Sequence, residues 1–178
     1  LGVLLCINGT GILNAWTRRL LGDLSYVEMN EQAASVEAGS EGLSVLPFGN
    51  GAERVLNNKN IGAQIVGLDL NRHGRGHLCR AVQEGIVFSF MYGIEIMADA
   101  GMPIHTIRAG DANMFMSSIF SQSLANISAA QIELYDTDGA LGAARGAGVG
   151  VGLYESLEQA FFTLEKKQTI EPDGTNLN

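Results

Sequence analysis

Apolar residues recur every three or four positions between residues 76 and 100, and this spacing predicts one long helix. Its inner face is formed by Leu78, Val82, Ile86, Phe90, Ile94 and Met97. The other faces are also poor in polar groups, because Ala81, Val87, Met91 and Ala98 occupy them. A helix that is apolar on nearly every face is packed on several sides, so we expect it to be the central helix of the domain.

Shorter segments on both sides of this helix predict alternating strands and helices. Strands are predicted at residues 3–7, 43–48, 61–68, 105–109 and 131–135. Helices are predicted at 12–21, 25–36, 114–125, 140–147 and 155–166, with Ser25 and Glu28 as a capping box, and residues 171–178 as a frayed tail. This order predicts an α/β fold whose helices are layered around a sheet that contains parallel strands.

The composition fits a globular domain with a sizeable core. The chain has 178 residues, 46% of them hydrophobic, with a formal net charge of -8 and a pI near 4.8. This acidic balance disfavours nucleic acid and anionic membranes as partners. Cys6 and Cys79 lie in apolar contexts without metal-type spacing, which favours two free thiols over a disulfide and indicates a reducing, cytoplasmic location.

The first residues indicate a sequence that begins inside a longer protein. Residues 1–7 are mostly apolar and begin without Met, without a basic flank and without a signal-peptide cleavage site. The run is also too short to cross a bilayer. We therefore expect the chain to be a C-terminal piece of a longer protein.

Three segments carry distinctive residues in a fixed order. The first holds Leu46-Pro47-Phe48 and ends in Glu53-Arg54, the second runs from Gly67-Leu68 through His73, Arg75, His77 and Arg80 to Glu84-Gly85, and the third is Gly139-Ala140-Leu141-Gly142-Ala143-Ala144. Together they resemble the C-terminal domain of the FGGY family of carbohydrate kinases, nearest to its xylulokinases. Residues 55–58 depart from the family's Thr-Pro, and Arg108-Ala109 stand where the family carries further glycines, a difference that can narrow a nucleotide pocket.

The resemblance implies an actin-like ATPase fold, related to ribonuclease H, in which two domains close around ATP and a sugar. It implies that residues 1–178 are the C-terminal domain, without its own first strands and without the N-terminal sugar-binding domain. The implied activity of the intact enzyme is phosphorylation of D-xylulose by ATP with Mg²⁺, and a homodimer is left open. The alternatives are a kinase for another sugar or polyol, and a non-catalytic actin-like domain that binds nucleotide or serves assembly. The presence of Glu53-Arg54 favours a kinase over a non-catalytic domain. Within the family, the same pair favours the xylulokinases over the glycerol kinases.

Two turns that lead into helices are candidate nucleotide contacts. At the turn of residues 110–113, a strand end meets a helix start, and by resemblance Gly110 lets the adenine approach the backbone while Asn113 bonds a polar edge of the nucleotide. The alternative is an ordinary turn in which Asp111 or Asn113 caps the helix. At the turn of residues 8–11, the same resemblance places Gly11 beside the nucleotide and Asn14 near the base, with a purely structural turn as the alternative.

The remaining polar residues are interpreted as structural. His73, Arg75, His77 and Arg80 favour hydrogen bonds that fix the loop before the long helix over a metal site. Glu53 and Arg54 are interpreted as a loop-fixing ion pair, with a place on the wall of the interdomain cleft as the alternative. Asp111, Asp136 and Asp138 fit capping positions, and by resemblance the catalytic base belongs to a motif upstream of this sequence, so no catalytic residue is predicted here.

Overall fold

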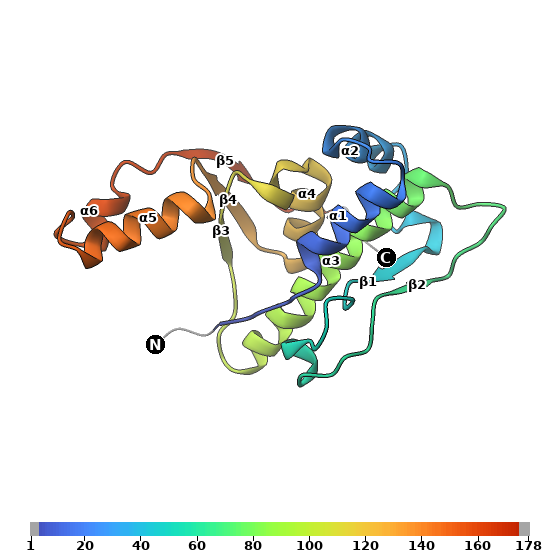
Figure 1. Ribbon diagram of the computed structural model, residues 1–178, viewed down its shortest axis with the longest axis horizontal. Coiled ribbons are helices and arrows are strands. Elements are labelled where there is room, and N and C mark those ends of the chain that lie inside the picture. The colour runs from blue at the N-terminus through green and yellow to red at the C-terminus, as the bar shows by residue number, and fades with distance from the viewer. Residues whose placement is uncertain (1–3, 175–178) are drawn as a thin grey trace.

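A computed structural model describes residues 4–174, and its longest element is the helix predicted at the centre. Helix α3 (Arg75–Asp99) runs through the middle of the molecule, with α1, α2, α4 and strand β1 packed around it (Figure 1). Val82 and Ile86 on one face of the helix and Val87 on another are all completely buried. The prediction of a central helix enclosed on several sides is therefore confirmed.

The other predicted helices form with shifted ends. They are α1 (Thr10–Leu20), α2 (Tyr26–Ala34), α4 (Ser118–Ser128), α5 (Gly139–Gly150) and α6 (Leu157–Phe161), with short 3₁₀ turns η1 (Ser40–Gly42), η2 (Arg54–Leu56) and η3 (Asn113–Met116). The predicted capping box of α2 is present, because Ser25 Oγ accepts from the Glu28 N–H while the Glu28 carboxylate accepts from the Ser25 N–H. The described helices include none with the length and apolar character needed to span a bilayer.

Two separate sheets lie on different sides of α3. Strands β1 (Ser44–Leu46) and β2 (Gln64–Val66) form an antiparallel hairpin, whereas β3 (Thr106–Gly110), β4 (Gln131–Tyr135) and β5 (Lys166–Ile170) form a mixed sheet. In that sheet β3 runs parallel to β4, in line with the predicted presence of parallel strands, and β5 runs antiparallel to β4. One face of the sheet is apolar and packs with α3 and α4 in the main core, through Ile132, Leu134, Ile170, Phe120 and Leu124.

The hairpin is held against α3 by a close backbone contact. A Cβ atom on Gly85 would lie only 1.9 Å from the carbonyl oxygen of Val45, so the central strand residue of β1 crosses the helix where α3 has no side chain. This contact fixes the hairpin on the side of α3 where it also faces α1.

Three predictions about the chain ends are wrong. Residues 4–7 form no strand, because no described strand lies beside them to complete a ladder; residue 3 is outside the described residues. The predicted helix 155–166 is cut to α6, and Lys166 instead begins β5, whose ladder with β4 outweighs local helical spacing. Residues 171–173 are not frayed, since Gln122 donates to the Glu171 carbonyl and Asn126 bonds Asp173, while residues 175–178 lie outside the described part.

Candidate functional site

The four residues predicted to contact nucleotide come together at two adjoining hollows between α1, α2 and the end of β3. The sheet-side hollow, of about 530 Å³, is lined by Gly11, Gly110 and Asn113 among others. The helix-side hollow, of about 380 Å³, is lined by Gly11, Asn14 and Asn113 among others. We call the two hollows together the α1 cleft. Residues about a hundred positions apart in the sequence thus meet at one place.

The sheet-side hollow receives the N-terminal ends of two helices. Thr10, the first residue of α1, and Gly139, the first residue of α5, both line it. The first N–H groups of a helix lack partners within the helix and carry partial positive charge. Such ends favour phosphate groups. The α5 end is already capped by the Asp138 carboxylate, whereas the α1 end has no side-chain cap and is the one suited to an anion.

The helix-side hollow contains an amide oxygen without a partner. Asn14 Oδ1 is buried and accepts no hydrogen bond, and Asn14 lines this hollow together with Asn30, Asn113 and Ser117. A buried polar atom that is left unpaired is unfavourable in the free protein. The hollow is therefore suited to a ligand whose polar edge bonds amide groups.

The backbone of the turn after β3 accounts for the residue types at positions 110 and 113. A Cβ atom on Gly110 would lie 2.2 Å from the carbonyl oxygen of Thr137, so packing by itself requires a glycine there. Asn113 has a φ of 55°, the left-handed region that Asn tolerates better than most residues. The capping alternative is wrong, because α4 is capped by Ser117 and Asp111 instead faces Lys167.

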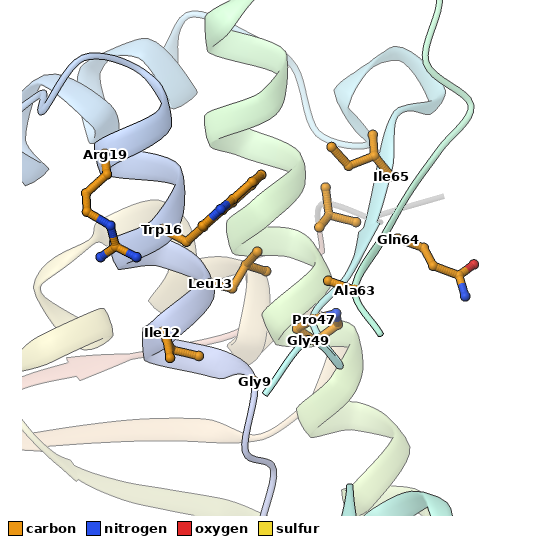
Figure 2. A pocket seen from close by; sticks show the side chains of 11 residues that line it. Gly9, Ile12, Leu13, Trp16, Arg19, Pro47, Gly49, Ala63, Gln64 and Ile65 are labelled. Atoms are coloured by element: carbon orange, nitrogen blue, oxygen red, sulfur yellow. The ribbon is translucent and has the colours of Figure 1, made fainter. Parts of the chain in front are cut away.

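A third hollow lies on the opposite side of α1, between this helix and the β1–β2 hairpin. It measures about 340 Å³, and none of the four predicted residues lines it. Figure 2 shows Leu13 and Trp16 reaching from α1 toward Ala63 and Ile65, while Gln64 points away. We call this hollow the α1–hairpin groove. Trp16 therefore lies in the groove, whereas Gly11 and Asn14 on the other face of α1 line the α1 cleft.

The predicted structural role of the loop before α3 is confirmed in most of its residues. His73 Nδ1 accepts from the Asp69 N–H, and His77 Nδ1 accepts from the Gly74 N–H. Arg80 donates to Glu84 and to the Val36 carbonyl. The described part of the chain contains no group of three His, Cys, Asp or Glu side chains placed to hold a metal ion.

Two further assignments change with the structure. Glu53 and Arg54 do not form the predicted ion pair: Glu53 is buried and accepts from the Asn8 N–H, whereas Arg54 is exposed.

Thr10 and Gly139 were missed as cleft residues, although each begins a helix after a turn. The signal that could have found them is that pattern, but only the tertiary structure brings the two helix starts together.

The face of the sheet turned away from the core carries a charged network. The Glu133 carboxylate accepts from Arg108, Tyr135 and Lys166, and these hydrogen bonds lower its pKa to about 2, with Arg108 the largest contributor. Just beyond the ends of β3 and β4, Lys167 lies 2.9 Å from Asp136 and 3.5 Å from Asp111, and the Asp136 carboxylate raises the pKa of the Lys167 ammonium group. These ion pairs engage two of the three aspartates near the cleft.

Comparison with known proteins places this geometry in a family. Residues 5–151 match the FGGY family of carbohydrate kinases, C-terminal domain. The chain belongs to this family. The fold is accordingly the actin-like ATPase fold, as the sequence predicted, and a solved xylulose kinase from Rhodospirillum rubrum superimposes with a TM-score of 0.76 at 27% identity, covering 94% of this chain and 34% of that one.

Curated proteins similar to this FGGY-family chain are named as kinases of sugars and of glycerol. It is 33% identical to an L-xylulose/3-keto-L-gulonate kinase of Escherichia coli over 90% of this chain and 32% of the relative. It is 31% identical to a xylulose kinase of Haemophilus influenzae over 96% of this chain and 35% of the relative. A glycerol kinase and a gluconate kinase are also similar. The chain thus spans about a third of the length of the curated relatives it matches.

Proposed function

We propose that this chain is the nucleotide-side part of an ATP-dependent carbohydrate kinase. The observation that carries the proposal is the α1 cleft, where Gly11, Asn14, Gly110 and Asn113 line adjoining hollows. Family membership supports the reaction class, and the length of the relatives supports a larger protein around this chain. We propose residues 1–178 as its C-terminal FGGY domain, without the first strands of that domain and without the N-terminal domain.

In this proposal the two hollows divide the nucleotide between them. The base lies in the helix-side hollow against Gly11, and the amide groups of Asn14 and Asn113 bond its polar edges. The phosphates lie in the sheet-side hollow, where the N-terminal end of α1, which has no side-chain cap, favours negative charge. Phosphoryl transfer depends mainly on positioning and electrostatic stabilisation, so fixing ATP in this way is the chain's contribution to the reaction.

The catalytic base is proposed to lie outside this chain. Asp111 and Asp136 face Lys167, and Asp138 caps α5 by accepting from the Leu141 N–H, so each has a structural role. The acceptor of the sugar proton and most of the sugar pocket then belong to the rest of the protein. Mg²⁺ is proposed only as the ion that accompanies ATP and balances its phosphate charge.

The proposed substrate is D-xylulose, which would be converted to D-xylulose 5-phosphate. Support comes from similarity to proteins named xylulose kinase and from the Glu53-Arg54 pair in the sequence. Relatives named for L-xylulose, glycerol and gluconate define the competing substrates. We propose a cytoplasmic location, which fits the free thiols of Cys6 and Cys79.

The test is coupled ADP release by the intact protein with D-xylulose, L-xylulose, glycerol and gluconate offered separately. We expect the highest kcat/KM with D-xylulose. A higher value with one of the other compounds would change the proposed substrate and leave the proposed kinase activity in place. Nucleotide binding without sugar-dependent ADP release would favour the non-catalytic alternative. The 178-residue chain alone should show no turnover and should bind ATP no tighter than about millimolar, roughly 4 kcal/mol. Turnover by this chain alone would contradict the proposed division of the site.

A further inference from the structure

A buried carboxylate lies outside the α1 cleft and is not used by the proposed function. Glu53 is 1% exposed, and its Oε2 accepts from the Asn8 N–H at 2.9 Å. Its Oε1 is buried and has no hydrogen-bond partner, and none of the ion pairs in the described part of the chain involves this residue. Burying a carboxylate with a single hydrogen bond is unfavourable. The role of Glu53 is therefore sought in the one bond that its carboxylate makes, to the Asn8 N–H.

The Glu53 bond is one of three that fasten Asn8 to the loop before η2. Asn8 Nδ2 donates to the Ala52 carbonyl at 2.8 Å, and Asn50 Nδ2 donates to the Asn8 carbonyl at 3.1 Å. The next residue is equally confined, because a Cβ atom on Gly9 would lie 1.6 Å from the Pro47 carbonyl oxygen. The turn before α1 is therefore fixed against residues 47–53 on both its backbone and its side chain.

This fixed turn leads directly into the cleft. Thr10 and Gly11 follow Asn8 by two and three positions, and both line the sheet-side hollow. Helix α1 has no side-chain cap of its own, because its N-cap is Gly9. The start of the helix must be held by contacts of the preceding turn, and the charged acceptor among them is Glu53.

We propose that Glu53 is a positioning residue for nucleotide binding, which acts through Asn8 to hold Thr10 and Gly11 on the wall of the α1 cleft. The inference rests on the proposed function, since it assigns the nucleotide to that cleft. Glu53 itself does not line either hollow, so its effect must pass through the turn. A carboxylate serves this purpose because its hydrogen bond to an N–H group is stronger than that of a neutral acceptor.

Glu84 provides a matched control. It is 2% exposed, and its carboxylate accepts from Arg80, from the Gly39 N–H and from Ser40. These bonds join α3 to the segment around η1 and do not reach the turn before α1. Loss of Glu84 therefore reports what removing a buried carboxylate does to stability when the cleft wall is left in place.

The experiment measures the Kd of a non-hydrolysable ATP analogue, AMP-PNP, for the intact protein and its variants. The variants are Glu53→Ala, Glu53→Gln, Asn50→Ala and Glu84→Ala, each with a melting curve and with hydrogen exchange of the Asn8 amide. Glu53→Ala should weaken AMP-PNP about tenfold and expose the Asn8 amide to exchange, while the KM for sugar changes less than about twofold. Glu53→Gln keeps an acceptor oxygen but not the charge, so it should weaken AMP-PNP by about threefold, less than Glu53→Ala does.

Asn50→Ala keeps the inference testable if Glu53→Ala does not fold. It removes an exposed bond to the same turn and should weaken AMP-PNP about threefold. Glu84→Ala should lower the melting temperature and leave the Kd unchanged. An unchanged Kd in both Glu53→Ala and Asn50→Ala, or an unaltered Asn8 exchange rate in Glu53→Ala, overturns the inference. AMP-PNP binding by a wild type that phosphorylates no sugar would overturn only the kinase activity, because the Glu53 comparison is made on binding.

Discussion

The two sides of helix α1 form hollows of similar size and different chemistry. The helix-side hollow of the cleft, about 380 Å³, contains the unpartnered Asn14 Oδ1 and three other polar side chains from Asn30, Asn113 and Ser117. The α1–hairpin groove, about 340 Å³, is walled mainly by apolar groups, with Trp16 the largest. Volume alone does not distinguish them. Buried polarity without a partner marks the side that fits a polar ligand, and the apolar side fits packing between α1 and the hairpin.

The largest expected effect is a loss of stability at Gly110, a residue of the cleft wall where packing requires a glycine. Gly110→Ala places a methyl group against the Thr137 carbonyl, where an ideal Cβ would lie at 2.2 Å. We expect a loss of about 3 kcal/mol in the free energy of unfolding, from overpacking against backbone. Urea unfolding of the intact protein measures it. Native-like stability would show that the β4–α5 turn adapts, and would then make Gly110 usable as a probe of nucleotide binding.

Gly11 separates the ligand role of the cleft from its structural role. A Cβ atom on Gly11 would meet no neighbouring atom within 4 Å, although this residue lines both hollows. Gly11→Val should raise the KM for ATP about 100-fold, roughly 2.7 kcal/mol, with the melting temperature unchanged. The control is Gly146→Val on α5, another helical glycine with open space that lines neither hollow. If Gly11→Val kept the wild-type KM for ATP, the nucleotide would not lie against Gly11.

Trp16 tests the groove side of the comparison. Its indole is 42% exposed and contributes to the contact between α1 and the hairpin. Trp16→Ala should lower the free energy of unfolding by about 2 kcal/mol, because partly buried apolar area is lost, while the KM for ATP stays within about twofold. Thermal unfolding and ATP kinetics are measured on the same preparation. A tenfold rise in this KM with native stability would mean that the groove serves the nucleotide.

Asn14 should show opposite effects on stability and binding. Asn14→Leu removes a buried oxygen that has no partner, so the free protein should be as stable as the wild type or more stable. The KM for ATP should rise about tenfold, roughly 1.4 kcal/mol, because a polar contact to the base is lost. Asn14→Gln is a conservative comparison that keeps the amide. Lower stability with unchanged kinetics would assign Asn14 to the fold.

The smallest effect is expected from the charged network behind the cleft. The pKa of Glu133 is lowered to about 2, so its carboxylate stabilises the folded state above the ordinary value of 4.5. This stabilisation is lost as the pH falls from 4.5 toward 2, because the unfolded chain takes up the proton first. Glu133→Gln should therefore unfold slightly earlier in urea than the wild type at pH 7, and the two curves should converge near pH 2. A gap that persists at pH 2 would exclude the carboxylate charge as its source.

The sequence could nominate residues for the candidate site, but it could not predict their geometry. Gly11, Asn14, Gly110 and Asn113 were each proposed as nucleotide contacts from short motifs and a family resemblance. Their convergence depends on α1 and the end of β3 meeting, which no local pattern encodes. The same limit explains Glu53, whose sequence neighbour Arg54 suggested an ion pair although its actual partner is the Asn8 N–H.

The sequence by itself determined most of the helices and strands, because their periodicity and caps act over a few residues. Helix α3, the capping box of α2 and the presence of parallel strands follow from it. Only the tertiary structure decided that Lys166 begins a strand and that residues 4–7 do not form one, since a ladder exists only where a partner strand is present. It also decided which face of α1 lines the cleft, because Gly11 and Trp16 lie on one helix and only packing against α3 and the hairpin separates them.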